Sequence, residues 1–398
     1  MKPELVSSQF ENELFQNILP FWMNHVLDEV NGGFFGGITN NLIVHNEIPR
    51  TAISCTRLLW TFSHAYLVSG DDKYINLAHS IYEYLIKAFW DDTYGGLFWS
   101  VDCHGRVVRD RKHHYAQAFG IYGLSEYYKA TGHKKSIQVA AEIFNLLETH
   151  AYDPKFGGYN EGSTRDWSSL SDMRLSEKDL NCQKSMNTML HLMEAYTNYL
   201  KVSHEKKVAT QLTNLILIFQ NKIISPANHF MLFFDADWTP LSNHVSFGHD
   251  IEGSWLLIEA AGVLGDKALI ELASKSALRL ASAVMQKGIR DDRAIVHEMS
   301  PDEDLNPNIE WWPQAEAVVG FYNAYQMTAD EKYKTASVNS WRYINEHLVD
   351  RIYGGWIKRL LPDGSFDENN LKAGPWEGPY HEARMCFEMI KRLKNQTN

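Results

Sequence analysis

Several stretches of the sequence place proton-moving or sugar-binding side chains where helices are predicted to begin. In residues 247–255, FGHDIEGSW, a polar loop gives way to an apolar, helix-like run, so His249 and Glu252 share one helix face. The free N–H groups and positive dipole end of a helix start suit an oxygen-rich ligand that gains negative charge. A histidine in this position is also often a cap or a buried hydrogen-bonding group. The stretch therefore indicates catalysis only if other polar groups face it.

Other polar groups lie on the helices predicted before this stretch. Asn187 and His191 are one helical turn apart, and on an inner helix they need partners, which they could provide for each other. Arg57 lies beside an apolar seam, either in a structural ion pair or as a fixed cation for sugar hydroxyls or an enolate oxygen. Tyr115, near a helix start, could line a cavity or fill the core.

Two aromatic stretches lie towards the end of the chain. Trp311 and Trp312 precede Pro313 at a predicted helix start and resemble a stacking platform at a cavity mouth. A Pro/Gly-rich loop carries Trp376 and leads to His381 in the last helix. The chain has 12 tryptophans and 13% aromatic residues, and such a surplus fits a site that stacks on sugar rings.

A repeat of helix pairs must position these groups. Short helix-to-helix turns, such as those at Gly70, Gly132 and Gly265, recur about every 65 residues or a multiple of it. Gly-Gly turns with nearby aromatic residues run half a period out of phase, and they begin at Gly32, Gly95, Gly157 and Gly354. The apolar spacing between the turns is helical. Six units of outer helix, long loop, inner helix and short turn account for the chain.

Helix pairs of this kind bury their apolar faces only by stacking on one another. They could form an open superhelix, but neither terminal pair looks like a polar cap, so a closed ring is favoured. The sequence predicts one all-α domain over residues 1–398, an (α/α)6 barrel of six helix pairs. Strand-like pieces at 96–101 and 231–235 predict short β-hairpins in the long loops on one rim, and we expect the binding site on that rim.

In this ring three histidines face one cavity. His191, His249 and His381 fall at or near the starts of the inner helices of units three, four and six. Histidine is suited to moving protons at neutral pH. The sequence contains no Cys/His metal spacing, glycine-rich phosphate loop or Gly-x-Ser-x-Gly elbow. None of these motifs therefore competes with the histidines, and we expect a catalytic cavity without a metal site.

Composition excludes several other classes of protein. The net charge is −11 without a basic cluster, which argues against a nucleic-acid surface. No run approaches the roughly 18 apolar residues of a membrane span, and the start of the chain lacks a signal-peptide core. Four scattered cysteines suggest reduced thiols. We expect a cytoplasmic monomer or weak homodimer that acts on a small-molecule sugar.

Four motifs occur in order along essentially the whole chain. They are SMNT at 185–188 with His191, FGHDIE at 247–252, WWPQAEA at 311–317 and W-x-GPYH at 376–381. Together they resemble the cellobiose 2-epimerases of the N-acylglucosamine 2-epimerase superfamily. The resemblance implies an (α/α)6 barrel, in agreement with the repeat. It also implies cofactor-free epimerisation at C2 of the reducing-end sugar of a disaccharide.

The resemblance further implies a mechanism through ring opening and a cis-enediolate. His249 and His381 would be the acid/base pair, and His191 would assist ring opening or hold the oxygen at C1. Arg57 and Asn187 would stabilise the enediolate oxygens. The remaining sugar contacts would come from Trp312, Trp376, Tyr115, Asp179, Glu252 and Glu298. Epimerisation at one carbon needs a proton donor and acceptor on opposed walls with oxyanion stabilisation between them, which fits these residue types.

Two positions depart from the pattern of the family. The family commonly has Asn-Gly after the last histidine, where this chain has Glu382-Ala383, and Lys after the loop tryptophan, where it has Glu377. Acidic groups beside His381 could change its basicity or the contacts to the second sugar. The preferred sugar therefore stays open among cellobiose, lactose, mannobiose and mannose.

The sequence predicts a 2-epimerase that interconverts reducing-end glucose and mannose of β-1,4-linked disaccharides. The alternative is a mannose/glucose 2-epimerase or an aldose–ketose isomerase acting on monosaccharides. An inverting glycosidase would use two carboxylates spaced for a water molecule. This alternative stays open because the chain offers Glu252, Glu310 and Glu316. A non-catalytic sugar-binding protein would bind a disaccharide without exchanging its C2 hydrogen.

Overall fold

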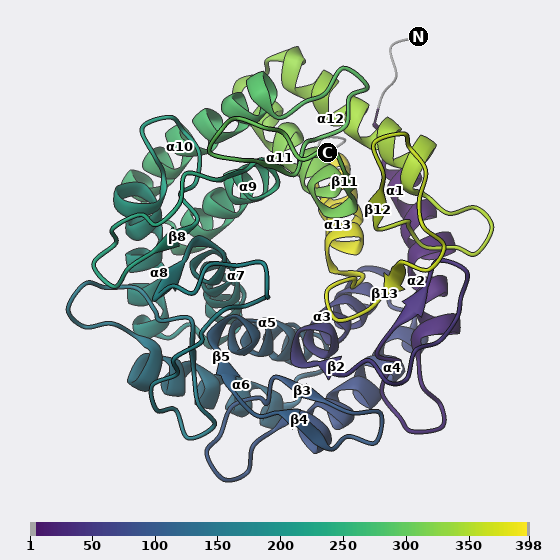
Figure 1. Ribbon diagram of the computed structural model, residues 1–398, viewed down its shortest axis with the longest axis vertical. Coiled ribbons are helices and arrows are strands. Elements are labelled where there is room, and N and C mark those ends of the chain that lie inside the picture. The colour runs from purple at the N-terminus through teal and green to yellow at the C-terminus, as the bar shows by residue number, and fades with distance from the viewer. Residues whose placement is uncertain (1–4, 396–398) are drawn as a thin grey trace.

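The computed structural model describes residues 5–395, and its helices form two concentric rings (Figure 1). The inner ring consists of α3 (Ala52–Ser69), α5 (His114–Thr131), α7 (Met186–Ser203), α9 (Phe247–Leu264), α11 (Trp311–Thr328) and α13 (Tyr380–Lys394). The first outer helix is the continuous run α1 (Ser7–Asn12), η1 (Glu13–Ile18), α2 (Leu19–Phe21) and η2 (Trp22–Val26). The other outer helices are α4 (Asp72–Tyr84), α6 (Lys134–Leu146), α8 (Lys206–Ile218), α10 (Lys267–Lys287) and α12 (Glu331–Tyr343). The predicted (α/α)6 barrel is confirmed.

The helices begin and end in recurring ways at the two rims of the barrel. Five of the outer helices finish in a π-helical turn: the first in η2, and the others in η3 (Leu85–Phe89), η4 (Leu147–Ala151), η5 (Phe219–Ile223) and η6 (Ile344–Leu348). On the short-turn rim, Gly70, Gly132 and Gly265 end inner helices with φ near 70°, a conformation that glycine adopts without a Cβ clash. Asp71 and Asp266 then accept backbone N–H groups at the start of the next outer helix.

Short strands occupy the opposite rim. They are β1 (Ile38–Thr39), β2 (Arg50–Thr51), β3 (Ser100–Val101), β4 (Val107–Arg109), β5 (Lys112–His113), β6 (Gly162–Ser163), β7 (Lys184–Ser185), β8 (Phe233–Phe234), β9 (Val245–Ser246), β10 (Glu298–Met299), β11 (Ile309–Glu310), β12 (Arg359–Leu360) and β13 (Leu371–Ala373). β3 and β4 form a hairpin within one loop. The other pairs are antiparallel and join successive loops, because the strand before each inner helix pairs with a strand of the next long loop.

Contacts between the two ends of the chain close the ring. β1 pairs with β13, so the last long loop is joined to the first. In the outer ring, Phe10 packs on Trp341 with ring centroids 4.7 Å apart. In the inner ring, Trp60 of α3 packs on Phe387 of α13 at 5.9 Å. The six units therefore form a closed barrel, and the open superhelix is not adopted.

Buried ion pairs hold four of the long loops at the rim that carries the strands. Each pair joins the aspartate that begins a Gly-Gly turn to a cation on a strand that precedes an inner helix. The pairs are Asp28–Arg50, Asp91–Lys112, Asp153–Lys184 and Asp350–Lys372. Each pair fixes a loop relative to the inner helix that follows it. Within residues 5–395, no helix is long and apolar enough to cross a membrane.

Candidate active site

A cavity of about 730 Å³ opens among the long loops, at the end of the ring where the inner helices begin. Its wall includes every residue that the sequence indicated for the site. These residues are His191, His249, His381, Arg57, Tyr115, Asn187, Asp179, Glu252, Glu298, Trp312 and Trp376. They come from three of the long loops and from all six inner helices, so the closed ring is what brings them together.

His249 lies in the first turn of α9, against an aromatic wall. Its Nδ1 atom is 2.7 Å from Oγ of Ser246, the residue that caps the helix. Its ring centroid lies 4.8 Å from that of Trp312. Gly248 makes this approach possible, because a Cβ there would lie 2.5 Å from the Trp312 ring. Burial lowers the pKa of His249 well below its usual value, so the imidazole is neutral at neutral pH.

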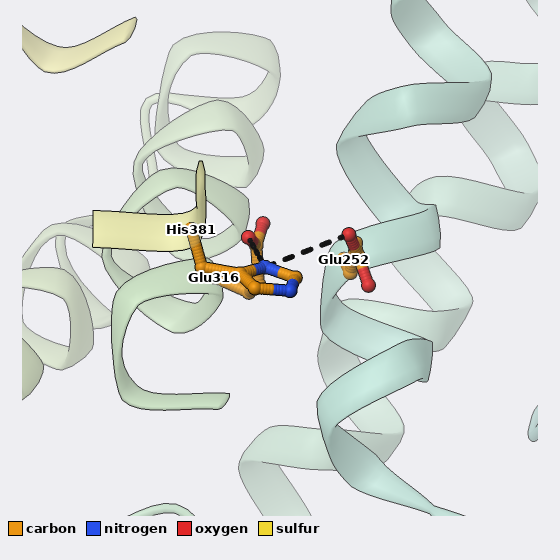
Figure 2. Close-up of side chains that lie close together, drawn as sticks. All are labelled: Glu252, Glu316 and His381. Carbon is orange, nitrogen blue, oxygen red and sulfur yellow. Dashed lines mark hydrogen bonds and ion pairs between the residues drawn. The ribbon is translucent and has the colours of Figure 1, made fainter. Parts of the chain in front are cut away.

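His381 lies in the first turn of α13 and faces two carboxylates, one from each of two other helices (Figure 2). Its Nδ1 atom is 2.7 Å from Oε1 of Glu316 on α11 and 3.9 Å from Oε1 of Glu252 on α9. A carboxylate only accepts, so Nδ1 carries the hydrogen and the Nε2 lone pair stays available as a base. Burial lowers the pKa of His381 well below its usual value, and nearby Arg384 adds to this effect.

The rings of both histidines lie against Trp312. The centroid of His381 is 5.4 Å from that of Trp312, compared with 4.8 Å for His249. The two imidazoles therefore come from different inner helices and meet beside one aromatic surface. A sugar resting on that surface would have a nitrogen base or acid available from two helices.

A buried arginine neutralises the carboxylates behind His381. Arg384 donates to Glu316 at 2.6 Å and to Glu252 and Glu194 at 2.5 Å each. Burial raises the pKa of Glu252 to about 8, and the negative charge of Glu316 adds to this shift. Burial opposes ionisation of Glu194 as well, but Arg384 and His191 lower the pKa of that group to about 2. At neutral pH Glu252 therefore holds a proton, and burial raises the pKa of Glu316 as well.

The same cluster has the spacing of a metal-ligand set. One atom from each of Glu252, Glu316 and His381 lies within 4.8 Å of the others. The guanidinium of Arg384 already donates to both carboxylates, so the charge that a cation would balance is balanced by the chain itself. The arrangement is suited to orienting an imidazole, because the carboxylates accept hydrogens and are themselves held in place.

His191 on α7 and Arg57 on α3 line the cavity beside this network. His191 Nδ1 donates to Glu194 at 2.9 Å, which leaves its Nε2 unprotonated in the neutral ring. Arg57 donates to the Tyr115 hydroxyl at 2.9 Å and stacks its guanidinium over Phe119 at 4.3 Å. Within residues 5–395 no carboxylate pairs with Arg57. The functional alternative for this arginine is thereby favoured over a structural ion pair.

Asn187 does not satisfy His191, although both lie on one face of α7. Its Oδ1 atom is buried without a hydrogen-bond partner among the described residues, while His191 bonds to Glu194. An unpaired buried amide oxygen is costly, and a ligand hydroxyl would relieve that cost. The rim above carries Asp179, which accepts the backbone N–H of Ser176 at 2.8 Å, and Glu298, 3.2 Å from His297.

The sequence left Glu194 and Arg384 out of the predicted site, and it noted Glu316 only as a candidate glycosidase acid. A signal for the first two was present, because Glu194 follows His191 by three residues and Arg384 follows His381 by three. Residues three apart share a helix face. His297 also lines the cavity, and its ring packs edge-on to Trp312 at 5.2 Å.

Glu377 and Glu382, the two acidic residues that depart from the family pattern near His381, have different surroundings. Glu382 is buried away from the cavity, where it accepts from Trp22 Nε1 at 3.0 Å and from Lys358 Nζ at 2.6 Å. Glu377 lines the cavity wall. Adjacent residues of a helix point about 100° apart, so a neighbour of His381 in the sequence need not share its environment.

Fold and site together define a barrel enzyme with three histidines in the wall of its cavity. The chain belongs to the N-acylglucosamine 2-epimerase family, whose family model matches residues 33–384, and it is an isomerase. It is 40% identical to a cellobiose 2-epimerase of Bacteroides fragilis over 389 residues, which cover 97% of this chain and 99% of that relative.

Two further relatives show the range of the family. The solved structure of the cellobiose 2-epimerase from Bacillus thermoamylovorans B4167 superposes with a TM-score of 0.92 and 36% identity, over 97% of this chain and 99% of that one. A D-mannose isomerase of Marinomonas mediterranea is 24% identical over 413 residues, covering 98% of this chain and 99% of the relative.

Proposed function

We propose that the protein interconverts reducing-end glucose and mannose of β-1,4-linked disaccharides by epimerisation at C2, without a cofactor, in the cytoplasm. The observation that carries the proposal is the meeting of His249 and His381 beside Trp312 in one cavity. The relatives named cellobiose 2-epimerase, which match over nearly the full length of the chain, also support the proposal. A volume of about 730 Å³ lies within the range of small-molecule sites and accommodates two sugar rings.

Ring opening is the first step of the proposed mechanism. The hydroxyl at C1 loses its proton, the bond between C1 and the ring oxygen breaks, and the ring oxygen takes up a proton. His191 assists, because Glu194 holds its Nδ1 hydrogen and leaves Nε2 to exchange protons with the substrate oxygens. The product of this step is the open-chain aldehyde.

Proton transfer at C2 follows. One histidine removes the C2 proton, and the electron pair moves through C1 to the aldehyde oxygen to give a cis-enediolate. Arg57 and Asn187 stabilise its oxygens, the cation by charge and the amide by hydrogen bonding. After rotation about the C2–C3 bond, the second histidine returns a proton to the opposite face of C2, and ring closure completes the reaction.

The Nδ1 partners of the two histidines suit them to opposite roles. Glu316 accepts from His381, whose Nε2 is then an unprotonated base. The Ser246 hydroxyl, 2.7 Å from His249 Nδ1, can instead donate, which places the hydrogen of His249 on Nε2. A neutral base and a neutral acid then stand ready in one cavity. Epimerisation in the reverse direction exchanges these roles.

The other predicted residues hold the sugars. Trp312 and Trp376 stack on the two rings, and Tyr115 orients Arg57 through their hydrogen bond. Asp179 and Glu298, on the rim, accept from hydroxyls of the outer sugar. Glu252 supports His381 from behind and shares Arg384 with Glu316.

A second candidate is an aldose–ketose isomerase acting on mannose, in which the enediolate is reprotonated at C1. The similarity to the D-mannose isomerase of Marinomonas mediterranea favours it. Analysis of the products formed from glucose, mannose, cellobiose, lactose and mannobiose distinguishes it from a disaccharide epimerase, because a ketose marks the isomerase.

An inverting glycosidase fits the geometry less well. Such enzymes separate their two carboxyl groups by about 6.5–9.5 Å to admit a water molecule. The nearest carboxylate oxygens of Glu252 and Glu316 lie within 4.8 Å of each other and share Arg384. Glu310, the third acid considered, is bound to Arg359 at 2.5 Å.

Hydrogen exchange at C2 is the decisive test. With cellobiose in deuterated water, we expect deuterium at C2 of both the substrate and its mannose-ended epimer, detected by NMR. We expect His249→Ala and His381→Ala to abolish this exchange while near-UV circular dichroism stays native. Near-normal turnover by either variant would contradict the acid/base assignment. Binding of cellobiose without exchange would show a sugar-binding protein, and released glucose would show a glycosidase.

A further inference from the structure

Glu377 is an acidic residue of the cavity wall without a cationic partner. It lies in the loop between β13 and α13 and lines the same cavity as His381. Within residues 5–395, the donors to its carboxylate are backbone N–H groups of its own loop, including that of Trp376 at 3.3 Å. No lysine or arginine of the described chain forms an ion pair with it.

Two charged residues near Glu377 already have partners. Glu310 on the same wall is held by Arg359 at 2.5 Å. The buried Lys358, whose charge acts on Glu377, is bound to Glu382 at 2.6 Å and forms no ion pair with Glu377. The cavity as a whole is lined by seven acidic side chains and four lysines or arginines, which makes it unfavourable for an anion.

The backbone makes room for this carboxylate. A Cβ at Gly374 would lie 2.6 Å from the Glu377 Oε2 atom, so the glycine leaves room for the carboxylate in its present position. Gly378, on the other side of Glu377, lies beside Arg57, with a Cβ position 3.8 Å from the Arg57 side chain. The carboxylate therefore lies between two glycines, next to the backbone N–H of Trp376.

We propose that Glu377 determines specificity at the second sugar: it accepts hydrogen bonds from hydroxyls of the outer ring and excludes anionic sugars such as uronates. This inference rests on the proposed function and names the substrate class of that site. The reacting carbon must lie between His249 and His381, in the first turns of their helices. Glu377 lies in the loop before α13, outside the helix turn that holds His381, and it is assigned to the sugar further from the reacting carbon.

The physical basis of this specificity is that the negative charge of Glu377 is not paired with a cation of the described chain. Hydrogen bonds from hydroxyls to a carboxylate are shorter and roughly twice as strong as those to a neutral acceptor. A second carboxylate brought to the same place would meet like charge in a cavity of low dielectric, and no lysine or arginine of the described chain is paired with Glu377 to offset it. A neutral outer sugar therefore gains from Glu377, whereas a uronate loses.

The test compares three sugars with the full chain and three variants. The sugars are cellobiose, the corresponding disaccharide with an outer glucuronate, and mannose. The variants are Glu377→Gln, Glu377→Asp and, as a matched control for loss of one negative charge, Glu368→Gln at an exposed position. The measured quantities are kcat and KM of C2 epimerisation, with circular dichroism to verify folding.

For Glu377→Gln we expect kcat/KM with cellobiose to fall about tenfold, mainly through KM, because one charged hydrogen bond becomes neutral. The ratio of kcat/KM for the uronate to that for cellobiose should rise at least tenfold, and the value for mannose should stay within about twofold. Glu377→Asp keeps the charge, so it should still reject the uronate while losing affinity for cellobiose. Glu368→Gln should resemble the unmodified protein.

Equal losses for mannose and cellobiose, or an unchanged uronate ratio in Glu377→Gln, would show that Glu377 only shapes its loop. If Glu377→Gln does not fold, an Asp variant that accepts the uronate would overturn the proposal equally. Absence of C2 exchange with every sugar in the unmodified protein would instead overturn the proposed function, and this inference with it.

Discussion

Nδ1 of His381 and the Arg384 guanidinium both bond to one oxygen, Oε1 of Glu316, at 2.7 and 2.6 Å. The second oxygen of Glu316 accepts from Trp255 Nε1 at 3.0 Å. Glu316 is therefore fixed by two donors besides the histidine, and His381 is held in one orientation and one tautomer. The first prediction follows from this relationship.

Replacement of Glu316 by Gln should lower kcat for epimerisation by about 10²–10⁴, the range found when a proton-transferring group loses its orientation or tautomer. KM should change little, because Glu316 does not line the cavity and touches His381 from behind. Steady-state kinetics with cellobiose measures both constants. Glu346→Gln, the same change at an exposed position of an outer helix, is the control. A kcat within threefold of the unmodified value would contradict the orienting role.

The value of kcat/KM should fall at both low and high pH, and buried groups should set the midpoints of the two limbs. Burial lowers the pKa values of His249 and His381 well below 6.5, so the imidazoles stay neutral and active as the pH falls past 6.5. The acid limb should therefore have its midpoint below 6.5. Burial raises the pKa of Glu252 to about 8, so activity should decline above about pH 8, as a second negative charge appears beside Glu316.

The Glu252→Gln variant distinguishes the causes of the two limbs, because the Gln amide does not ionise as the Glu252 carboxyl does. Its profile, scaled to its own maximum, should keep the acid limb and lose the alkaline one. An unchanged alkaline limb in this variant would assign that limb to another group.

Removal of the shared cation should destabilise the fold. Arg384→Met leaves Glu194, Glu252 and Glu316 buried around one another without compensation, and breaking a buried ion pair from one side typically costs about 3–5 kcal/mol. Urea unfolding followed by circular dichroism measures this loss. Arg106→Met removes a surface pair instead, and it should cost at most about 1 kcal/mol. Similar losses in the two variants would refute the structural importance of the buried network.

Two glycines of α9 should respond to alanine in opposite ways. A Cβ at Gly248 would lie 2.5 Å from the Trp312 ring and 3.0 Å from Pro313, so Gly248→Ala should displace Trp312 and cost about 1–3 kcal/mol. Because Trp312 lies against both histidines, epimerisation should fall as well. Gly262 has open space around its Cβ position, and Gly262→Ala should stabilise the helix by roughly 0.5–1 kcal/mol at full activity. Thermal unfolding and kinetics of the two variants test this contrast.

The sequence by itself predicted the fold and part of the cavity wall. Turns such as Gly70 and Gly132 recur with one period, and apolar spacing between them is helical, so the number of helix pairs follows from local information. Helix starts could be located in the same way. Since all inner helices begin at one rim, polar residues at those starts, such as His249 and His381, had to meet there.

Only the tertiary structure decided which polar groups pair. Glu252 shares a helix face with His249, yet its partner is Arg384, which follows it by 132 residues. Glu382 is adjacent to His381 but is bound to Lys358 outside the cavity, whereas Glu377 faces the cavity. Spacing along one helix fixes the direction of a side chain relative to its own axis alone. Its partner depends on how several helices are rotated against one another, and the packing of the closed ring sets those rotations.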